Sequence, residues 1–483
     1  MAYPDDKLSV AALHDSARTE LLDDRAWFNN EAGIGYEYGY RRYRDPRYIP
    51  IINNAAKSFE LTVHNGPPSL FQDISTEAPP KRPIESVNFY NAGYGVLRTA
   101  GVDGKPNQAL MEYGSALVGH SHPSKLGIDV YALGDVLMPM PGVIFPYNDP
   151  LDAAWYWSTP ANNIVAIDES PQKHGGNAWT FPRGSADPVA PQLVFLPGKT
   201  IGIQRAWTNT SHPGATEDRS IFLTSQYVVD LYFAGGTTSH TFDYCSHFRG
   251  ELTANLPMKP FSFGEKAQPG YKALTEVQSG TADRAFSAEV TTPAGAKVHF
   301  FLPAAGSTQV ITGKGHFYLK NPKQSETPAT IILRRTGETS TLFGSAVDIS
   351  GGAFVKGVEQ SGSLEKGYGL LNVTTADGSD VCFTAFRPGS YSAGDVKTDG
   401  LQAYVRTSGG KVTAMSLGGG KSLEFKDASI TRSTPGLALV ETTDEGVVVV
   451  NPSPEEATIT VSLPGSAKFS ETLKGGESKT IGK

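Results

Sequence analysis

The residues best suited to chemistry lie in the stretch 119–126, Gly-His-Ser-His-Pro-Ser-Lys-Leu, where His120 and His122 are two positions apart. In an extended chain such residues face the same side, so both imidazoles would point in one direction. A pair of this kind can bind a metal, relay a proton or position an anionic substrate. Two polar residues at an exposed junction between a loop and a strand explain the pattern equally well, because H-x-H is short and common.

Apolar runs flank this motif and predict the strands that would position it, Ala109–Met111 before it and Lys125–Leu133 after it. From Val87 onward nearly the whole chain has strand-like patterns, and its 52 glycines and 33 prolines indicate many turns. Pairs of turn residues between alternating runs predict hairpins at Ala294-Gly295, Asp377-Gly378, Gly409-Gly410 and Glu445-Gly446. The sequence therefore predicts a mainly β protein.

The first 60 residues differ from the rest, with apolar residues at helical spacing in three stretches, Ser9–Leu22, Glu31–Arg44 and Ile49–Ser58. Asp45-Pro46 would end the second helix, because proline disfavours helical geometry at the residue before it. Proline pairs then mark a linker. We expect four parts, namely a helical segment over 1–66, a linker over 67–86, a large antiparallel β-sandwich over 87–390 and a small C-terminal β-sandwich over 391–483.

Composition excludes several classes of function. The net charge of −7 argues against nucleic acid as a partner bound by bulk charge. The two cysteines, Cys245 and Cys382, exclude a disulfide scaffold and a cysteine-rich zinc module. No apolar run approaches the roughly 20 residues that cross a bilayer, so we expect no membrane partner. Residues Met1–Lys7 lack the basic and apolar regions of a signal peptide.

The segment Ala109–Gly134 resembles a motif of the heparinase II/III-like polysaccharide lyases, G-H-x-H-x-D-K-L at the entry to a strand. Ser124 stands where that family has aspartate. Three later segments are similar to family motifs in the expected order: Trp157–Glu169, Tyr227–His247 and Pro328–Gly337.

The resemblance implies a large antiparallel β-sandwich (a supersandwich) preceded by an α/α toroid of helical hairpins, with the substrate cleft between them. Residues 1–66 would be the last helices of that toroid. The chain would then be a fragment, a subunit whose partner chain supplies the missing helices, or a variant that has lost them.

The resemblance also implies β-elimination on an acidic polysaccharide or oligosaccharide, such as alginate or a glycosaminoglycan, in the periplasm or outside the cell. The catalytic candidates are His120, which matches the histidine that faces the cleft from the sandwich, and Tyr147. Two alternatives stay open. One is a non-catalytic carbohydrate-binding or assembly protein that retains the sandwich, and the other is a uronate C5-epimerase.

Aromatic and cationic residues near the motifs are the candidates for substrate binding: Tyr113, Lys125, Trp157, His240 and Arg249. Arg205 and Arg219 are further possible partners for a substrate carboxylate. Flat aromatic faces suit sugar rings, but such residues also fill β-rich cores. Exposed cations are usually solvated surface.

His122 matches a residue that binds a structural zinc in several relatives, together with a downstream aspartate and histidine. Here Met140 and Asn162 occupy the corresponding regions, and neither is a good zinc ligand. We therefore expect no metal and no other cofactor. His122 is instead predicted to hydrogen-bond Asn162, and we expect a structural polar role for His122, Asn162, Asn163 and His247.

Overall fold

A computed structural model describes residues 9–10, 19–20, 40, 42–49, 85–102, 104–114, 121–142, 148–173, 190–265, 267–303, 307–318, 325–465 and 468–482. Most of these residues form antiparallel strands, so the expected mainly β architecture is confirmed. Three sheets make up the body of the molecule. We call them the short sheet, the central sheet and the C-terminal sheet.

The N-terminal region contains one departure from the predicted helices. Within the stretch predicted as the first helix, β1 (Ser9–Val10) and β2 (Thr19–Glu20) pair as antiparallel strands, so a helix over these residues was wrong. A helix of that length is marginal without packing, and pairing satisfies the same backbone groups. The end of the second helix is as predicted, since the Arg44 amide donates to the Tyr40 carbonyl (2.7 Å) and a 3-10 helix, η1 (Pro46–Tyr48), follows. The remaining helical predictions lie outside the described residues.

The short sheet has five strands in chain order: β3 (Val87–Phe89), β4 (Tyr94–Ala100), β5 (Pro106–Glu112), β6 (Ile128–Ala132) and β7 (Asp135–Met138). Strands β3 and β4 form a hairpin. Gly93, with φ of 74°, makes that turn, and a Cβ there would lie 2.1 Å from the Gly114 Cα. The sheet thus brings β5 and β6, on either side of the histidine motif, next to each other.

The central sheet contains twelve strands within the described residues. They are β8 (Val165–Ile167), β9 (Gln192–Leu196), β10 (Ile201–Thr208), β11 (Ala215–Thr224), β12 (Tyr227–Phe248), β13 (Glu251–Ala254), β14 (Lys259–Pro260), β15 (Thr275–Ala282), β16 (Phe286–Thr291), β17 (Lys297–Leu302), β18 (Thr308–Lys314) and β21 (Ala329–Asp348). A separate small pair is formed by β19 (Phe317–Tyr318) and β20 (Ser325–Glu326). The long strands β12 and β21 pair along most of their length and form the spine of this sheet.

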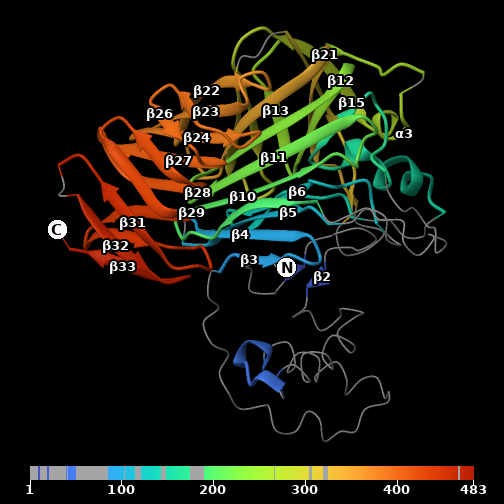
Figure 1. Cartoon of the computed structure of the whole chain (residues 1–483). Coiled ribbons are helices and arrows are strands. Elements are labelled where there is room, and N and C mark those ends of the chain that lie inside the picture. The colour runs from blue at the N-terminus through green and yellow to red at the C-terminus, as the bar shows by residue number, and fades with distance from the viewer. Residues whose placement is uncertain are drawn as a thin grey trace, which may run out of the picture.

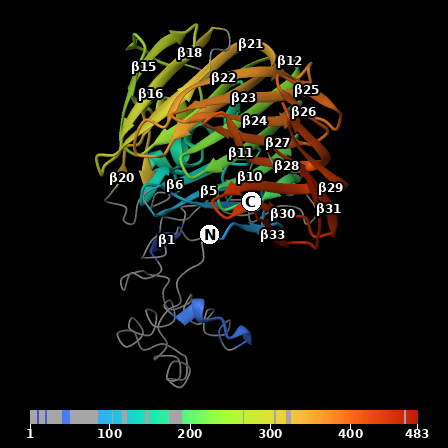
Figure 2. The ribbon, with the colours of Figure 1, turned by 90° about the vertical axis from the view of Figure 1, so that its left-hand side faces the viewer.

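Both faces of the central sheet are buried along β10 and β11. On β11, Ile221 and Leu223 join the core against the short sheet, whereas Phe222 between them joins the core against the C-terminal sheet. Successive side chains of a strand point to opposite faces, so a run of consecutive apolar residues serves two cores. Figures 1 and 2 show the result, with the short sheet and the C-terminal sheet on different sides of β10–β12.

The C-terminal sheet also contains twelve strands among the described residues. They are β22 (Val355–Ser363), β23 (Tyr368–Thr375), β24 (Gly378–Ala385), β25 (Tyr391–Ala393), β26 (Val396–Thr398), β27 (Gln402–Ser408), β28 (Lys411–Phe425), β29 (Ala428–Thr443), β30 (Gly446–Val450), β31 (Ala457–Ser462), β32 (Phe469–Leu473) and β33 (Ser478–Ile481). Strands β24 and β27 pair directly, so the boundary expected between residues 390 and 391 falls inside this sheet. The central sheet ends at Asp348 and the C-terminal sheet begins at Val355.

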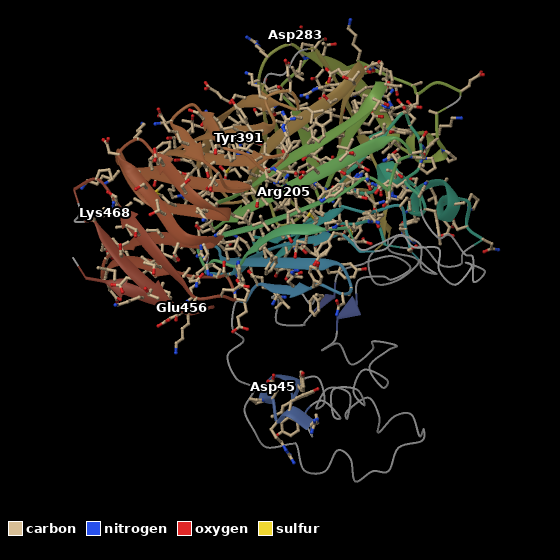
Figure 3. The ribbon with its side chains drawn as sticks, in the orientation of Figure 1. Asp45, Arg205, Asp283, Tyr391, Glu456 and Lys468 are labelled. Carbon is tan, nitrogen blue, oxygen red and sulfur yellow. The ribbon has the colours of Figure 1, made fainter. Side chains whose placement is uncertain are left out.

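The hairpin turns predicted from glycine pairs are confirmed: β16–β17, β23–β24, β27–β28 and β29–β30 each turn at the expected residues. Figure 3 places Arg205 in the interior, where the central and C-terminal sheets meet, and Asp283, Glu456 and Lys468 at the periphery. The turns are thus surface features, and the charged side chains buried between sheets come from strand interiors.

Helical structure is sparse in the described body and clusters at one end of the central sheet. It comprises a π-helix, η3 (Asp152–Tyr156), a 3-10 helix, η4 (Thr159–Ala161), and one turn of α-helix, α3 (Pro269–Lys272). Trp155, Tyr156 and Tyr271 from these turns pack on Cys245 and Ile332 of the sheet. Among the described residues, no helix has the length and apolar character needed to cross a bilayer.

Candidate functional site

The second half of the histidine motif forms a buried turn that leads into β6. Ser121, His122, Ser124 and Lys125 are all at most 2 % exposed. Leu126 has φ of 68°, a left-handed conformation that is costly for a residue with a Cβ and persists only where the surroundings impose it. The catalytic candidates His120 and Tyr147 lie outside the described residues. The structure describes the residues that follow His120 and their contacts, but neither of these two side chains.

Glu112 at the end of β5 anchors this turn from one side. The Leu126 amide donates to the Glu112 carbonyl (2.7 Å), and Ser124 Oγ donates to Glu112 Oε2 (3.0 Å). Ser124 is the residue that departs from the family motif. A hydroxyl can donate a hydrogen bond to a buried carboxylate, whereas an ionised aspartate at this position would repel it. Serine at position 124 is therefore compatible with the buried Glu112 carboxylate.

Arg219 of β11 anchors the turn from the central sheet. Its guanidinium is fully buried and binds Asp230 with two bonds, Nε to Oδ1 (3.1 Å) and Nη2 to Oδ2 (2.5 Å). Its Nη1 donates to the carbonyls of Leu126 (2.6 Å) and Asn163 (2.5 Å). Arg219 was a possible substrate partner in the sequence, but these contacts make it a clamp between the turn and the sheet.

Asn163 joins the turn to the segment after η4. Its Nδ2 donates to the carbonyls of Ile128 (2.9 Å) and Pro139 (3.0 Å), and its Oδ1 accepts from the His247 amide (2.7 Å). Asn162 Nδ2 donates to the Ser158 carbonyl (3.1 Å) and, at 3.5 Å, approaches the Pro123 carbonyl. The pairing of Asn162 with His122 stays a prediction.

His247 is buried beside these asparagines. Its Nε2 lies 2.9 Å from the Pro160 carbonyl and its Nδ1 lies 2.9 Å from Thr330 Oγ1. Burial lowers the pKa of His247 to about 4, so the ring is neutral near pH 7. Since a carbonyl only accepts, Nε2 carries the proton and Nδ1 accepts from the threonine hydroxyl. These bonds suit a supporting residue.

A further polar network was not predicted from the sequence. Gln172 Nε2 donates to the Lys125 carbonyl (3.1 Å) and lies 3.4 Å from Glu217 Oε1, which also accepts from Tyr232 (2.8 Å). His212 Nδ1 lies 3.0 Å from Glu217 Oε2. Burial alone would lower the pKa of His212, but the Glu217 carboxylate raises it overall.

Two predicted substrate-binding aromatics lie close to the motif. The Trp157 ring is partly exposed and lies 4.8 Å from the His122 ring. Tyr113 is buried and its hydroxyl donates to Asn88 Oδ1 (2.5 Å), while burial raises its pKa to about 12. Trp157 is therefore only partly covered, so its role in substrate binding stays a prediction, and Tyr113 is placed as part of the core.

The other substrate-binding candidates have protein partners. Arg249 binds Glu326 through Nε (2.6 Å) and Nη2 (2.8 Å) and pairs with Asp135 (2.6 Å). His240 Nδ1 lies 2.6 Å from Asp168 at an irregularity of β12.

The region expected to hold zinc in relatives is built from poor ligands. Met140 is buried next to His122's turn and its amide lies 3.4 Å from Asp129 Oδ2. The Asn162 amide nitrogen donates to a backbone carbonyl. Within the described part of the chain, no group of three histidine, cysteine, aspartate or glutamate side chains is placed to hold a metal ion.

Comparison with known proteins gives one match to a family model and several to solved structures. Residues 81–261 match the family model described as heparinase II/III-like, C-terminal. This part of the chain is similar to heparinase II/III-like C-terminal domains. A search of curated proteins found no match.

Solved structures share the fold of this chain. Heparan sulfate lyase HepC from Pedobacter heparinus aligns over 80% of this chain and 51% of its own, with 12% identity and a TM-score of 0.54. A heparinase III structure aligns over 80% of this chain and 52% of its own, with 11% identity and a TM-score of 0.55. At such identity the likeness shows the fold. The chain spans about half the length of these proteins.

Proposed function

We propose that this chain forms the sandwich half of a polysaccharide lyase that cleaves an acidic, uronate-containing glycan by β-elimination. The heparinase II/III-like domain supports the proposal at the level of the family. The proposal places the substrate against the surface that follows β5, where His120 precedes the buried turn. It also places the protein where such polymers occur, in the periplasm or outside the cell.

The proposed reaction breaks the C5–H and C4–O bonds of the substrate and forms the C4–C5 double bond and an O–H bond on the leaving group. A base removes the proton at C5, the electron pair forms the C4–C5 double bond, and the C4–O bond breaks. An acid then protonates the leaving oxygen. The uronate carboxylate must be neutralised by hydrogen-bond donors or cations, because negative charge develops next to it. His120 and Tyr147 are the residues of this chain that we assign to the reacting sugar.

The rigid turn at residues 121–126 supports a site at His120. Proton transfer requires groups held within a few tenths of an ångström, which in turn requires a second set of residues that fixes the backbone. Glu112, Gln172, Arg219 and Asn163 each bond this turn or the strand after it. Buried hydrogen bonds in this number are not required for a simple strand connection, so they support a turn that holds a functional residue in place.

Ultraviolet absorbance tests the proposal, because the unsaturated uronate left by elimination absorbs where the intact polymer does not. We expect absorbance to rise with at least one polymer from a panel of alginates and glycosaminoglycans, and not with neutral glucans. No rise with any uronate polymer at several pH values contradicts lyase action by this chain.

A non-catalytic carbohydrate-binding protein is the second candidate. It is favoured because Arg219 and Arg249, two cations considered for a substrate carboxylate, are both bound to protein carboxylates. Affinity electrophoresis in gels containing each uronate polymer separates the two. Retarded migration without any rise in absorbance supports binding alone, whereas absorbance that rises with turnover supports the lyase.

A further inference from the structure

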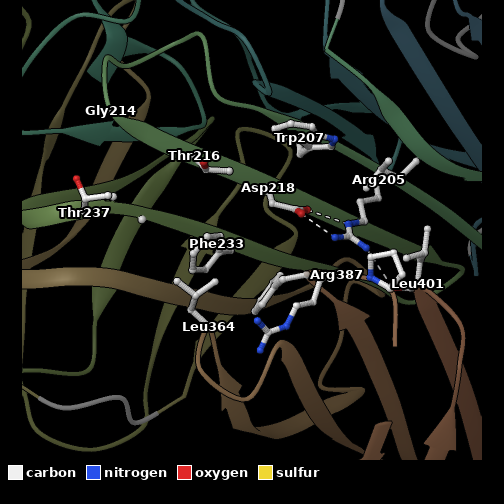
Figure 4. A pocket seen from close by; sticks show the side chains of 15 residues that line it. Arg205, Trp207, Gly214, Thr216, Asp218, Phe233, Thr237, Leu364, Arg387 and Leu401 are labelled. Atoms are coloured by element: carbon white, nitrogen blue, oxygen red, sulfur yellow. Dashed lines mark hydrogen bonds and ion pairs between the residues drawn. The ribbon is translucent and has the colours of Figure 1, made fainter. Parts of the chain in front are cut away.

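A pocket of about 570 Å³ opens where the central sheet meets the turns of the C-terminal sheet. Figure 4 shows Trp207 of β10 and Phe233 of β12 on the central sheet, and Leu364 and Leu401 from turns of the C-terminal sheet. The volume is in the range of about 300–1,000 Å³ that is typical of sites for small molecules. None of its lining residues belongs to the histidine motif.

The charged pair in this pocket is already satisfied. Arg205 binds Asp218 with two bonds, Nε to Oδ1 (2.9 Å) and Nη2 to Oδ2 (2.7 Å), and the dashed lines of Figure 4 mark them. Its Nη1 donates to the Leu401 carbonyl (3.2 Å). Each side of the guanidinium is occupied, so the pair adds no net charge and offers a ligand little hydrogen bonding.

The rim of the pocket is apolar and exposed. Leu193 and Leu364 are 36% and 42% exposed, and they are two of the few large hydrophobic side chains that the described residues leave so accessible. Phe386 also lines the pocket, and its ring lies 4.7 Å from that of Phe233. Exposing a contiguous apolar surface to water is unfavourable. Covering it with a ligand stabilises the complex by about 25 cal/mol per Å² of apolar surface buried.

One cation lies at the mouth. Arg387 is exposed, and its guanidinium donates to the Glu365 carbonyl (3.1 Å). Among the residues that the structure describes, no carboxylate lies within ion-pair distance of it. The pocket therefore combines apolar walls with a single positive charge at its edge.

We propose that this pocket binds a single-chain amphiphile with an anionic head, such as a fatty carboxylate, with the tail against Phe233 and Leu364 and the head at Arg387. A sugar fits less well, because its hydroxyls would face leucine and phenylalanine walls. Each buried hydroxyl left without a partner costs about 1–3 kcal/mol. The site is independent of the proposed lyase reaction.

Calorimetric titration with decanoate and with decanol tests the proposal, because the two ligands share a tail and differ in charge. We expect Arg387→Gln to weaken decanoate by about tenfold, the loss of one charge-assisted contact, and to leave decanol unchanged. Leu364→Ser should weaken both ligands by about fivefold, since it removes apolar contact from the tail. Both residues are exposed, and circular dichroism verifies that the variants fold.

Arg284→Gln and Val102→Ser are matched controls, because both side chains are exposed at sites away from this pocket. Unchanged binding in both controls supports the assignment. Three results overturn it: no binding of decanoate to the unmodified protein, equal losses in the controls, or binding of a uronate oligosaccharide that depends on Arg387 and Leu364 while decanoate does not bind.

Discussion

Ser124 illustrates how one residue can depart from a family motif without disturbing the site. The family's aspartate would face Glu112 at hydrogen-bond distance in a buried turn, where two carboxylates repel each other. Serine instead donates a bond to that carboxylate. The motif in the sequence revealed the substitution, but the compensating Glu112 could be recognised only when β5 and β6 were seen side by side.

Restoring the aspartate should therefore destabilise the protein. We expect Ser124→Asp to lower the free energy of unfolding by about 2 kcal/mol or more, and Ser124→Ala by about 1 kcal/mol. Adding Glu112→Gln to Ser124→Asp should recover most of the loss, because the repulsion is gone. Urea unfolding measures all four proteins. A double variant no more stable than Ser124→Asp alone would show that the two side chains are not coupled.

His247 ties stability to pH through a buried neutral ring. Its folded pKa of about 4 lies below the ordinary value of 6.5, so between these values the unfolded chain binds a proton that the folded protein does not. Acidification through this window therefore favours unfolding, and the contribution of His247 is complete above about pH 6.5.

Replacing His247 by glutamine should flatten this dependence. Between pH 7 and pH 4 we expect the free energy of unfolding of the unmodified protein to fall by about 3 kcal/mol more than that of His247→Gln. This is the free-energy equivalent of the difference between the folded and unfolded pKa values of His247. Chemical unfolding at several pH values measures the two curves. Parallel curves would contradict the assignment of a neutral buried ring.

The elements that support the site were only partly predictable. Alternating patterns with glycine turns located the hairpins, because turn chemistry is local. The three-layer stack was not predicted, since consecutive apolar residues such as Ile221, Phe222 and Leu223 indicate a buried strand without saying which sheet covers each face. Likewise nothing local in the sequence marks Gln172 or Arg219 as partners of residues 121–126, because these contacts join segments that are far apart in the chain.

A buried acid joins the two large sheets. Asp380 of β24 accepts bonds from Tyr404 Oη (2.7 Å) and Arg406 Nε (2.9 Å), both on β27, and from the Tyr227 hydroxyl on β12 of the central sheet. Burial raises the pKa of both tyrosines, so their hydroxyls keep the protons that they donate. One carboxylate thus connects strands of different sheets.

Loss of this charge should loosen the contact between the sheets. We expect Asp380→Asn to reduce the free energy of unfolding by about 3–5 kcal/mol, because the Arg406 side chain, only 18% exposed, loses its counter-ion. Asp395→Asn is the control, since Asp395 pairs with Lys426 at an exposed site (3.5 Å) and should cost no more than about 1 kcal/mol. Calorimetric unfolding compares them, and equal losses would contradict a special role for Asp380.

For the whole molecule, the residues matched by the family model include the histidine motif, and the buried turn after it supports the site that we propose. The sequence suggested this site because the motif combines two histidines with strands on both sides. The facing wall that the resemblance implies is not assigned to residues here, and this chain spans about half the length of the solved relatives. The proposed reaction therefore depends most on His120, the residue that we assign to the reacting sugar.

The rate of ultraviolet absorbance increase for His120→Ala on a cleaved uronate polymer tests this central claim. We expect the rate to fall at least about 100-fold, since a positioned proton-transfer group contributes roughly 10²–10⁴. His299→Ala is the control, because His299 lies on β17 beside Glu289, outside the motif, and its loss should leave the rate unchanged. A His120→Ala rate equal to that of the unmodified protein would contradict the account.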